Sequence, residues 1–110
     1  MRISWKRLRK NLPNKVRAAS RAIYEVFLSQ DFHFDEHKEK TFGITRFDPR
    51  QIVLNTNQGD KEFIHSLWHE YLHAISAETD ANLTEAQVCA LEKSFIYVRE
   101  FILLLEKRKK

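Results

Sequence analysis

The spacing of hydrophobic residues changes along the chain and predicts two kinds of element. From about Asn14 to Gln30, apolar residues recur every three or four positions, which indicates an amphipathic helix whose other face is basic and polar. From Phe32 to Asn55, apolar residues alternate with polar ones or form short runs, which predicts three short strands. The apolar residues of these strands are Phe32 and Phe34, then Phe42, Ile44 and Phe47, and finally Ile52, Val53 and Leu54.

Turn and capping residues set the expected limits of the later elements. Asp48-Pro49 is expected to form a type I turn between the last two strands, with Pro49 as its first central residue. Asp60 is expected to cap a helix that runs to about Ser76, and residues 77–83 would connect it to the next helix. Together these patterns predict an α+β fold.

One long helix is predicted at the C-terminal end. Thr84 and Gln87 have the spacing of a capping box, and an apolar stripe continues through residues 88–105. Phe101 and Leu104 widen this stripe beyond one face of the helix. The additional apolar surface predicts either a dimer interface or extra burial within the chain.

Length and composition predict one domain that spans residues 1–110. The chain is 43% hydrophobic, which is enough for one modest core, and its 2 Gly and 2 Pro leave little material for long loops. The only cysteine, Cys89, cannot form an internal disulfide, and we expect a small packed residue in a reducing cytosol. No apolar run has the length of a signal-peptide core or a membrane span, so a soluble cytoplasmic protein is expected.

Positive charge is concentrated at both ends of the chain. The net charge is +4, and a basic N-terminal segment (residues 1–13) belongs to a long stretch that precedes the first acidic residue, Glu25. Residues 107–110 form a second basic cluster. Such ends can contact nucleic acid or an acidic partner, but no nucleic-acid-binding motif accompanies them, which favours solvated termini.

The sequence His69-Glu70-Tyr71-Leu72-His73 is an HExxH motif within the second predicted helix. Residues four apart lie above one another on a helix, so His69 and His73 can direct two imidazole nitrogens to one zinc ion. Glu70 is then the expected general base, because a carboxylate beside a catalytic zinc ion takes a proton from water. The apolar residues of this helix gather on the opposite arc, which disfavours two histidines that merely fill a core.

A catalytic zinc site needs a third protein ligand, which the motif does not supply. The extended pattern with a third histidine fails, because Ser76 and Thr79 occupy its glycine and histidine positions. A carboxylate from the region that follows is the remaining solution, and the candidates are Glu78, Asp80, Glu85 and Glu92.

The segment Thr84-Glu85-Ala86-Gln87-Val88-Cys89-Ala90 resembles the E-A-N-x-F-A stretch that follows HExxH in the ImmA/IrrE group of small phage and bacterial metallopeptidases. Ile52-Val53-Leu54-Asn55, just ahead of the HExxH helix, is also similar to that group. The resemblance implies a minimal zincin-like domain of the gluzincin type, with Glu85 as the third metal ligand. Gln87 stands in place of the family's Asn, and Cys89 in place of its Phe.

Each carboxylate of the last predicted helix has a second interpretation. An acid in the first turn, such as Glu85, also stabilises a helix through its dipole. Glu92 lies seven residues later on the same face, so it is either the alternative ligand or an acceptor that orients a histidine.

The expected function is zinc-dependent hydrolysis of a peptide bond in an intracellular protein of a bacterial or phage-infected cell. An extended substrate would pair with the sheet edge formed by residues 42–47. The alternative is a metal-binding regulatory module that binds a protein or nucleic acid without turnover, and a phage structural protein with a fortuitous motif is a third interpretation.

Other polar residues have weaker claims to a role. His65 shares a helix face with His69, and His33 and His37 lie in a charged stretch where they are expected to be solvated. Tyr71 falls on the apolar arc and is expected in the core.

Overall fold

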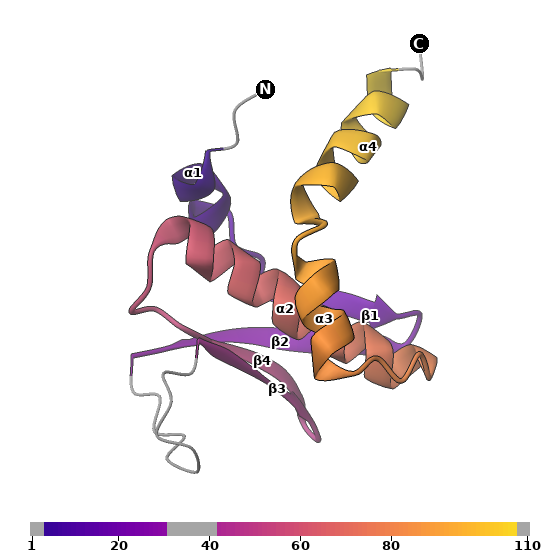
Figure 1. Ribbon diagram of the computed structural model, residues 1–110. Coiled ribbons are helices and arrows are strands. Elements are labelled where there is room, and N and C mark those ends of the chain that lie inside the picture. Colours follow the sequence, from indigo (N-terminus) through magenta and orange to yellow (C-terminus); the bar gives the residue numbers. More distant parts are fainter. Residues whose placement is uncertain (1–3, 31–41, 108–110) are drawn as a thin grey trace.

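Residues 4–30 and 42–107, which the computed structural model describes, form an α+β fold with four helices and one four-stranded sheet (Figure 1). The elements are, in chain order, α1 (Trp5–Lys10), β1 (Lys15–Ala19), β2 (Ala22–Ser29), β3 (Gly43–Phe47), β4 (Arg50–Asn55), α2 (Asp60–Thr79), α3 (Glu85–Glu92) and α4 (Phe95–Lys107).

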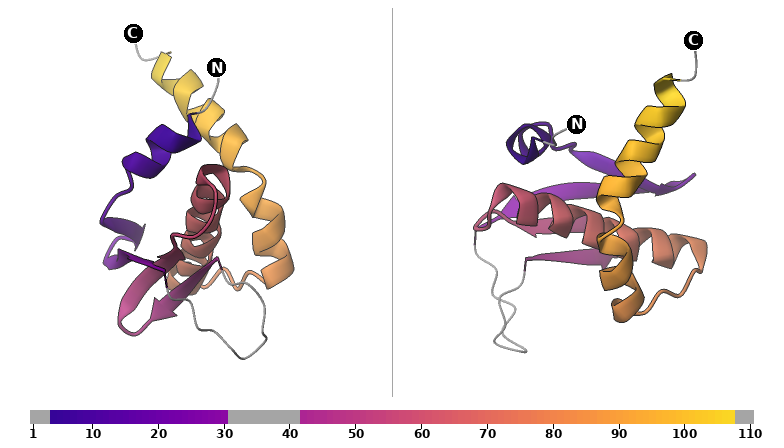
Figure 2. Two further views of the ribbon diagram at one scale, coloured as in Figure 1. Left: turned by 90° about the vertical axis from the view of Figure 1, so that its left-hand side faces the viewer. Right: turned by 45° about the horizontal axis from the view of Figure 1, so that its top comes forward.

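The sheet is mixed and has the strand order β1-β2-β4-β3. β1 pairs with β2 and β3 pairs with β4 in antiparallel fashion, whereas the two central strands, β2 and β4, are parallel. Helix α2 lies across one face of this sheet, with α1 and α3 packed against it (Figures 1 and 2). This order leaves β3 at the edge of the sheet, beside α2.

The helix predicted over residues 14–30 is wrong, since this segment forms the β1–β2 hairpin. Its apolar residues fit a helical spacing, but the structure buries alternate positions, with Ala22 and Tyr24 inside. Ile23 and Phe27, which contributed to the apparent helical stripe, lie exposed on the other face of the strand. The hairpin turn contains neither Gly nor Asn, so the usual sequence signal for a hairpin is missing.

The last two predicted strands are confirmed as β3 and β4, whereas the strand predicted around Phe32 and Phe34 lies outside the described residues. The turn between β3 and β4 is at the expected place. Pro49, however, is the second of the two residues between the strands, and the Asp48–Pro49 peptide bond is cis. The expected arrangement, with Pro49 as the first central residue, is therefore not the one adopted.

Helix α2 begins at Asp60, but Asp60 is not its cap. Gly59 occupies the N-cap position without a side-chain hydrogen bond, and Asp60 is an acid of the first turn, where it favours the helix dipole. The helix continues three residues beyond the expected end, to Thr79. Asp80 then adopts a left-handed conformation at the C-cap, with φ of 57°, which aspartate tolerates better than most residues.

The single long C-terminal helix is also a wrong prediction, because the chain breaks it at Lys93 and Ser94 into α3 and α4. The carbonyl of Leu91 accepts hydrogen bonds from the backbone and hydroxyl of Ser94 and from the indole of Trp68, at 3.3 Å for the indole. A serine side chain that competes for a helix carbonyl favours such a stop. The capping box of Thr84 and Gln87 at the start of α3 is confirmed.

The core lies between α2 and the sheet. Its buried residues are Ala18, Ala22, Tyr24, Ile52, Leu54, Phe63, Ile64 and Ala74. Tyr71, which was expected in the core, is only half-buried against it, and its hydroxyl donates to the carbonyl of Arg17.

Part of the basic N-terminal segment is structural. Arg9 on α1 donates to the carbonyls of Gln58 and Thr56, at 2.7 and 2.8 Å, and pairs with Asp60 at 3.2 Å. Its guanidinium also lies over the ring of Phe63, 4.2 Å from the centroid. The expectation of merely solvated charge therefore fails at Arg9, which holds α1 onto the start of α2.

Helix α4 extends away from the rest of the molecule (Figures 1 and 2). Phe101 and Leu104 are 60% and 61% exposed, so extra burial within the described chain does not account for the wide apolar stripe. None of the helices formed by residues 4–30 and 42–107 combines the length and the apolar character needed to cross a membrane.

Candidate metal centre

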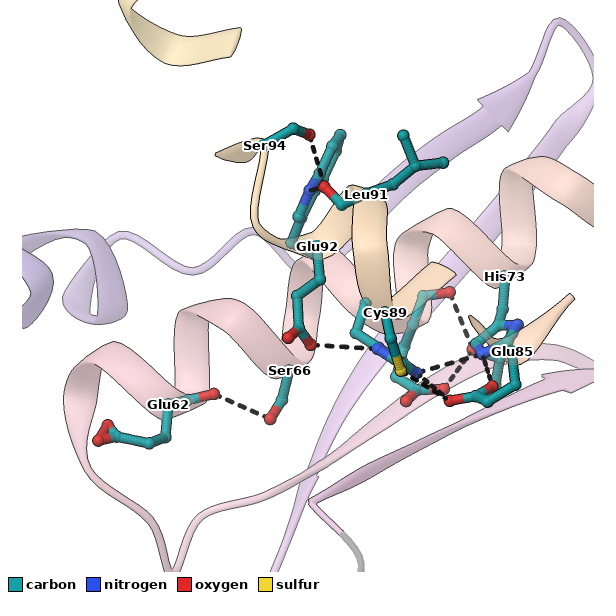
Figure 3. Close-up of polar contacts among 12 residues, drawn as sticks. Glu62, Ser66, His73, Glu85, Cys89, Leu91, Glu92 and Ser94 are labelled. Carbon is teal, nitrogen blue, oxygen red and sulfur yellow. Dashed lines mark hydrogen bonds and ion pairs between the residues drawn. The ribbon is translucent and has the colours of Figure 1, made fainter. Parts of the chain in front are cut away.

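Helices α2 and α3 bring two histidines and one carboxylate to the same point. Nε2 of His69 lies 3.2 Å from Nε2 of His73, as expected for residues four apart on a helix. Glu85, in the first turn of α3, spans both rings: its Oε1 is 2.9 Å from His69 Nε2 and its Oε2 is 2.8 Å from His73 Nε2 (Figure 3). Of the four carboxylates considered from the sequence, Glu85 is thus the one brought to both histidines.

The position of Glu92 favours one tautomer of His69. Nδ1 of His69 lies 3.1 Å from Oε1 of Glu92, and a carboxylate there favours a proton on Nδ1. Nε2 of His69 then carries a lone pair and faces the oxygens of Glu85 and Nε2 of His73. Such acceptors repel one another unless a proton or a metal ion lies between them.

The donor set fits zinc. Zinc is bound by imidazole nitrogen and carboxylate oxygen at about 2.0–2.2 Å, and such bonds place the ligand atoms of a tetrahedron roughly 3.3–3.6 Å apart. The separations of 2.8 to 3.2 Å among His69, His73 and Glu85 are slightly shorter than this. A small outward shift of Glu85, whose side chain is 65% exposed, would therefore admit the ion.

Glu92 contacts the back of His69 and not the point where the two Nε2 atoms meet. Metal-binding histidines commonly donate their other ring nitrogen to a carboxylate, which fixes the ring and its tautomer. The geometry therefore favours Glu92 as the orienting acceptor, one of the two roles that the sequence left open.

Glu70 lies on the side of α2 that faces strand β3. It is only 9% exposed, and its Oε1 is 2.8 Å from the hydroxyl of Thr45. The same hydroxyl is 2.9 Å from the backbone carbonyl of Glu70, so its single proton serves one of these two oxygens at a time. The side chain passes directly over Gly43, where a Cβ atom would lie 3.1 Å from Glu70 Cγ.

Burial raises the pKa of the Glu70 carboxyl above its ordinary value. The hydrogen bond from Thr45 and the charges of His69 and His73 act in the opposite direction, since each favours the carboxylate. A carboxyl group with a raised pKa is a stronger base when ionised, which suits a group that must take and return a proton near neutral pH.

A pocket of about 290 Å³ opens between the start of β3, α2 and α3. It is lined by Phe42, Gly43, Ser66, His69, Glu70, Glu85 and Glu92. Glu70, the candidate base, therefore faces the same space as the candidate ligands His69 and Glu85. Glu92, which contacts His69, also lines this space beside the edge strand.

Two other carboxylate candidates lie elsewhere. Glu78 accepts from the Tyr24 hydroxyl at 2.8 Å and pairs with Arg50 at 2.7 Å, on the far part of α2. Asp80 forms the C-cap of α2. Neither is brought to His69 or His73.

The remaining sequence candidates have mixed outcomes. His65 packs among the rings of Trp5 and Phe95, at 5.4 and 6.3 Å between centroids, and its buried Nε2 has no hydrogen-bond partner among the described residues. His33 and His37 lie outside those residues. Cys89 is exposed, so its expected role as a small packed residue is wrong.

Sequence reasoning missed Thr45 and Gly43. Both belong to β3, and they reach Glu70 only because α2 folds back over the edge of the sheet. A glycine at the first residue of an apolar strand was the available signal, since glycine in a strand often marks a close approach.

Comparison with protein-family models, with curated proteins and with solved structures found no match for this chain. The assignment of a function therefore rests on the residues of the site.

Proposed function

We propose that this protein is a zinc-dependent metallopeptidase that hydrolyses a peptide bond in an intracellular protein. One observation carries the proposal: Nε2 of His69, Nε2 of His73 and the carboxylate of Glu85 converge within 2.8 to 3.2 Å, next to the buried carboxyl of Glu70. The resemblance of residues 84–90 to the ImmA/IrrE metallopeptidases supports the same assignment.

His69, His73 and Glu85 are the residues that would hold the ion, with Glu92 fixing the ring of His69. A zinc ion with three protein ligands supplies Lewis-acid polarisation of a carbonyl group and lowers the pKa of water. Because Glu85 comes from α3 and the histidines from α2, the packing of these two helices sets the geometry of the site.

Glu70 is proposed as the general base. Its carboxylate takes a proton from a water molecule in the pocket as the oxygen of that water bonds to the scissile carbonyl carbon, and it delivers the proton to the amine nitrogen as the C–N bond breaks. Thr45 stabilises the ionised form by donating to Oε1, and can turn to the backbone carbonyl of Glu70 when the carboxyl holds a proton. The Thr45 hydroxyl therefore has an acceptor on Glu70 whether the carboxyl is ionised or protonated.

An extended segment of a protein is the proposed substrate. Strand β3 is at the end of the sheet order and pairs with β4 alone in the described part of the chain. Phe42 and Gly43, at the start of that strand, line the pocket that contains Glu70. A substrate strand added to this edge would gain main-chain hydrogen bonds and carry its peptide bond past the pocket.

A trapping experiment tests the proposal. Glu70→Gln keeps the shape of the side chain and leaves all three candidate ligands in place, so the variant should bind about one zinc per chain and retain its partner. Partners captured with this variant are then incubated with wild-type protein, and fragments are identified by mass spectrometry. Zinc-dependent fragments that Glu70→Gln produces at least about 100-fold more slowly support hydrolysis.

The alternative is a metal-binding regulatory module without turnover. One observation favours it. The Glu70 carboxyl already accepts a hydrogen bond from Thr45 and its side chain packs closely over Gly43, as expected for a carboxyl group with a structural role. A captured partner that stays intact with wild-type protein and zinc would select this alternative. Absence of bound zinc would instead favour the third interpretation, a fortuitous motif.

A further inference from the structure

Cys89 lies beside the candidate metal centre, next to Glu85. It follows Glu85 by one turn of α3 and shares its face, and its Sγ is 3.7 Å from Glu85 Oε1 (Figure 3). The ligand atoms of His69, Glu85 and Cys89 all lie within 4.8 Å of one another. A thiol therefore stands at the rim of the two-histidine and carboxylate cluster.

The thiol is not held there by packing. Cys89 is exposed, and the side chain of Glu85 beside it is 65% exposed, so a change of rotamer in either meets little resistance.

Thiolate is a strong ligand for zinc, with a Zn–S distance of about 2.3 Å. His69, His73 and Glu85 provide three ligands, and a catalytic zinc site leaves its fourth position open. A fourth protein ligand fills that position and gives a closed site of the structural kind. Sγ of Cys89 is 3.7 Å from Glu85 Oε1, and the group of ligand atoms within 4.8 Å joins Cys89 to His69 and Glu85 but not to His73, so a rotation about its Cα–Cβ bond would have to bring Sγ toward the point that all three share.

We propose that Cys89 Sγ is a releasable fourth ligand of the metal ion held by His69, His73 and Glu85. The inference rests on the proposed metal site and adds regulation to it. While the thiolate is bound, the position needed for hydrolysis is occupied and the protein is latent. Release of Cys89 opens the position and leaves the other three ligands in place.

Cobalt(II) provides a direct test, because it occupies zinc sites and gives a near-ultraviolet charge-transfer band when bound to thiolate. The full-length wild-type protein loaded with one equivalent of Co²⁺ is expected to show this band. Cys89→Ala should bind Co²⁺ with the same stoichiometry but without the band. Ala90→Ser, another exposed change on α3, is the matched control and should retain it.

A second measurement uses the reactivity of the thiol. Because a thiolate bound to metal is shielded from electrophiles, zinc should slow the alkylation of Cys89 by iodoacetamide. The affinity for Co²⁺ should also fall in Cys89→Ala. Losing a residue that only hydrogen-bonds to a metal ligand typically costs about 10–100-fold in affinity, and losing a ligand should cost at least as much.

The outcomes separate this inference from the proposal on which it rests. Stoichiometric Co²⁺ without the band in wild type, or alkylation unaffected by zinc, overturns the role of Cys89 and leaves the three-ligand site intact. If wild type binds no Co²⁺ or Zn²⁺ at all, both proposals are wrong. If His69→Ala loses the metal and the wild-type protein shows the thiolate band, the three-ligand site and the role of Cys89 are both supported.

Discussion

The hydroxyl of Thr45 lies 2.8 Å from Glu70 Oε1, which ties the edge strand of the sheet to the proposed catalytic carboxyl. This contact joins residues 25 positions apart in the chain. The strand that would bind an extended substrate is therefore also the strand that sets the position of the base. In the proposed mechanism, binding at this edge and proton transfer at Glu70 would be coupled through the side chain of Thr45.

Thr45→Val should weaken this link. Valine has nearly the same shape but donates no hydrogen bond, and a lost bond worth about 1 kcal/mol corresponds to roughly a fivefold loss in kcat/KM. Thr45→Ser restores the hydroxyl and should recover most of the rate. Peptide cleavage by both variants, at equal zinc content, makes the comparison; equal rates for Val and Ser would remove Thr45 from the catalytic arrangement.

Gly43→Ala should displace Glu70. The added Cβ would meet Glu70 Cγ at 3.1 Å, Leu54 Cδ2 at 3.2 Å and the carbonyl oxygen of Val53 at 3.3 Å, and the backbone oxygen cannot move freely. We expect a stability loss of about 1–3 kcal/mol from overpacking. Cleavage activity should fall further than thermal stability explains, measured below the melting temperature of the variant.

Gly59→Ala is the control for that substitution. The three atoms nearest to a Cβ there belong to the carboxylate of Glu62, the closest at 3.1 Å, on a flexible side chain that can turn away. Its effect should be confined to the start of α2, with activity per folded molecule unchanged. Equal losses of activity in the Gly43 and Gly59 variants would contradict a specific contact with Glu70.

The two carboxylates of α3 should differ in their effect on metal affinity. Glu92→Gln can still accept from His69 through its amide oxygen but loses the charge, so zinc affinity should fall by about 10–100-fold. Glu85→Gln removes a proposed ligand and should cost more. Competition with a chelator gives both constants, and Glu100→Gln on α4 serves as the control; a greater loss for Glu92→Gln would exchange the two roles.

A second polar cluster predicts how stability depends on pH. Burial raises the pKa of the Tyr24 phenol to about 12, helped by the hydrogen bond to Glu78, while Arg50 and Tyr24 lower the pKa of Glu78. The Tyr24 contribution is complete below about pH 10, the ordinary pKa of tyrosine, and is lost as the pH rises toward 12. The Glu78 contribution is complete above the ordinary pKa of glutamate and is lost as the pH falls below it.

Tyr24→Phe should therefore lose about 0.5–1.5 kcal/mol of stability at neutral pH and show a weaker alkaline decline. Glu78→Gln should flatten the acid side of the profile. Urea unfolding at a series of pH values measures both, with Tyr97→Phe, 71% exposed on α4, as the control. An unchanged alkaline decline in Tyr24→Phe would assign that decline to other groups.

The exposed face of α4 leads us to propose a dimer through the C-terminal helix. Burying a large apolar side chain is worth about 1.5–3 kcal/mol, so Phe101→Glu should raise the dimer dissociation constant by at least about tenfold. Light scattering over a concentration series gives the constant, and Glu100→Gln on the same helix is the control. A wild-type protein that stays monomeric throughout the series would rule this interface out.

The HExxH helix and the capping box were predictable because their signals are local. His69 and His73 need only helical spacing to approach each other, and Thr84 meets Gln87 within one turn. The sequence also limited the candidates for a third ligand to four carboxylates. The choice of Glu85 depends on how α3 packs against α2, which spacing along the chain does not determine.

The errors arose where tertiary contacts override local pattern. Residues 14–30 have a helical spacing of apolar positions, yet β2 pairs with β4, and the sheet decides which residues are inside. At the break between α3 and α4, the carbonyl of Leu91 also accepts from Trp68 on another helix, a contact that the local pattern does not reveal. Thr45 could not be found as a partner of Glu70, because they meet only after the sheet and α2 have packed.

The parallel pairing of β2 with β4 constrains both the folding of the protein during synthesis and the truncations it can tolerate. Glu25 to Ser29 match Gln51 to Asn55, so the two middle strands of the sheet cannot join until both stretches have left the ribosome. Until then, the β1–β2 hairpin has the edge of β2 that pairs with β4 exposed. For the same reason, a shortened version that starts after Ser29 would lack half of the sheet, and the helix bearing His69 and His73 would have lost much of its support.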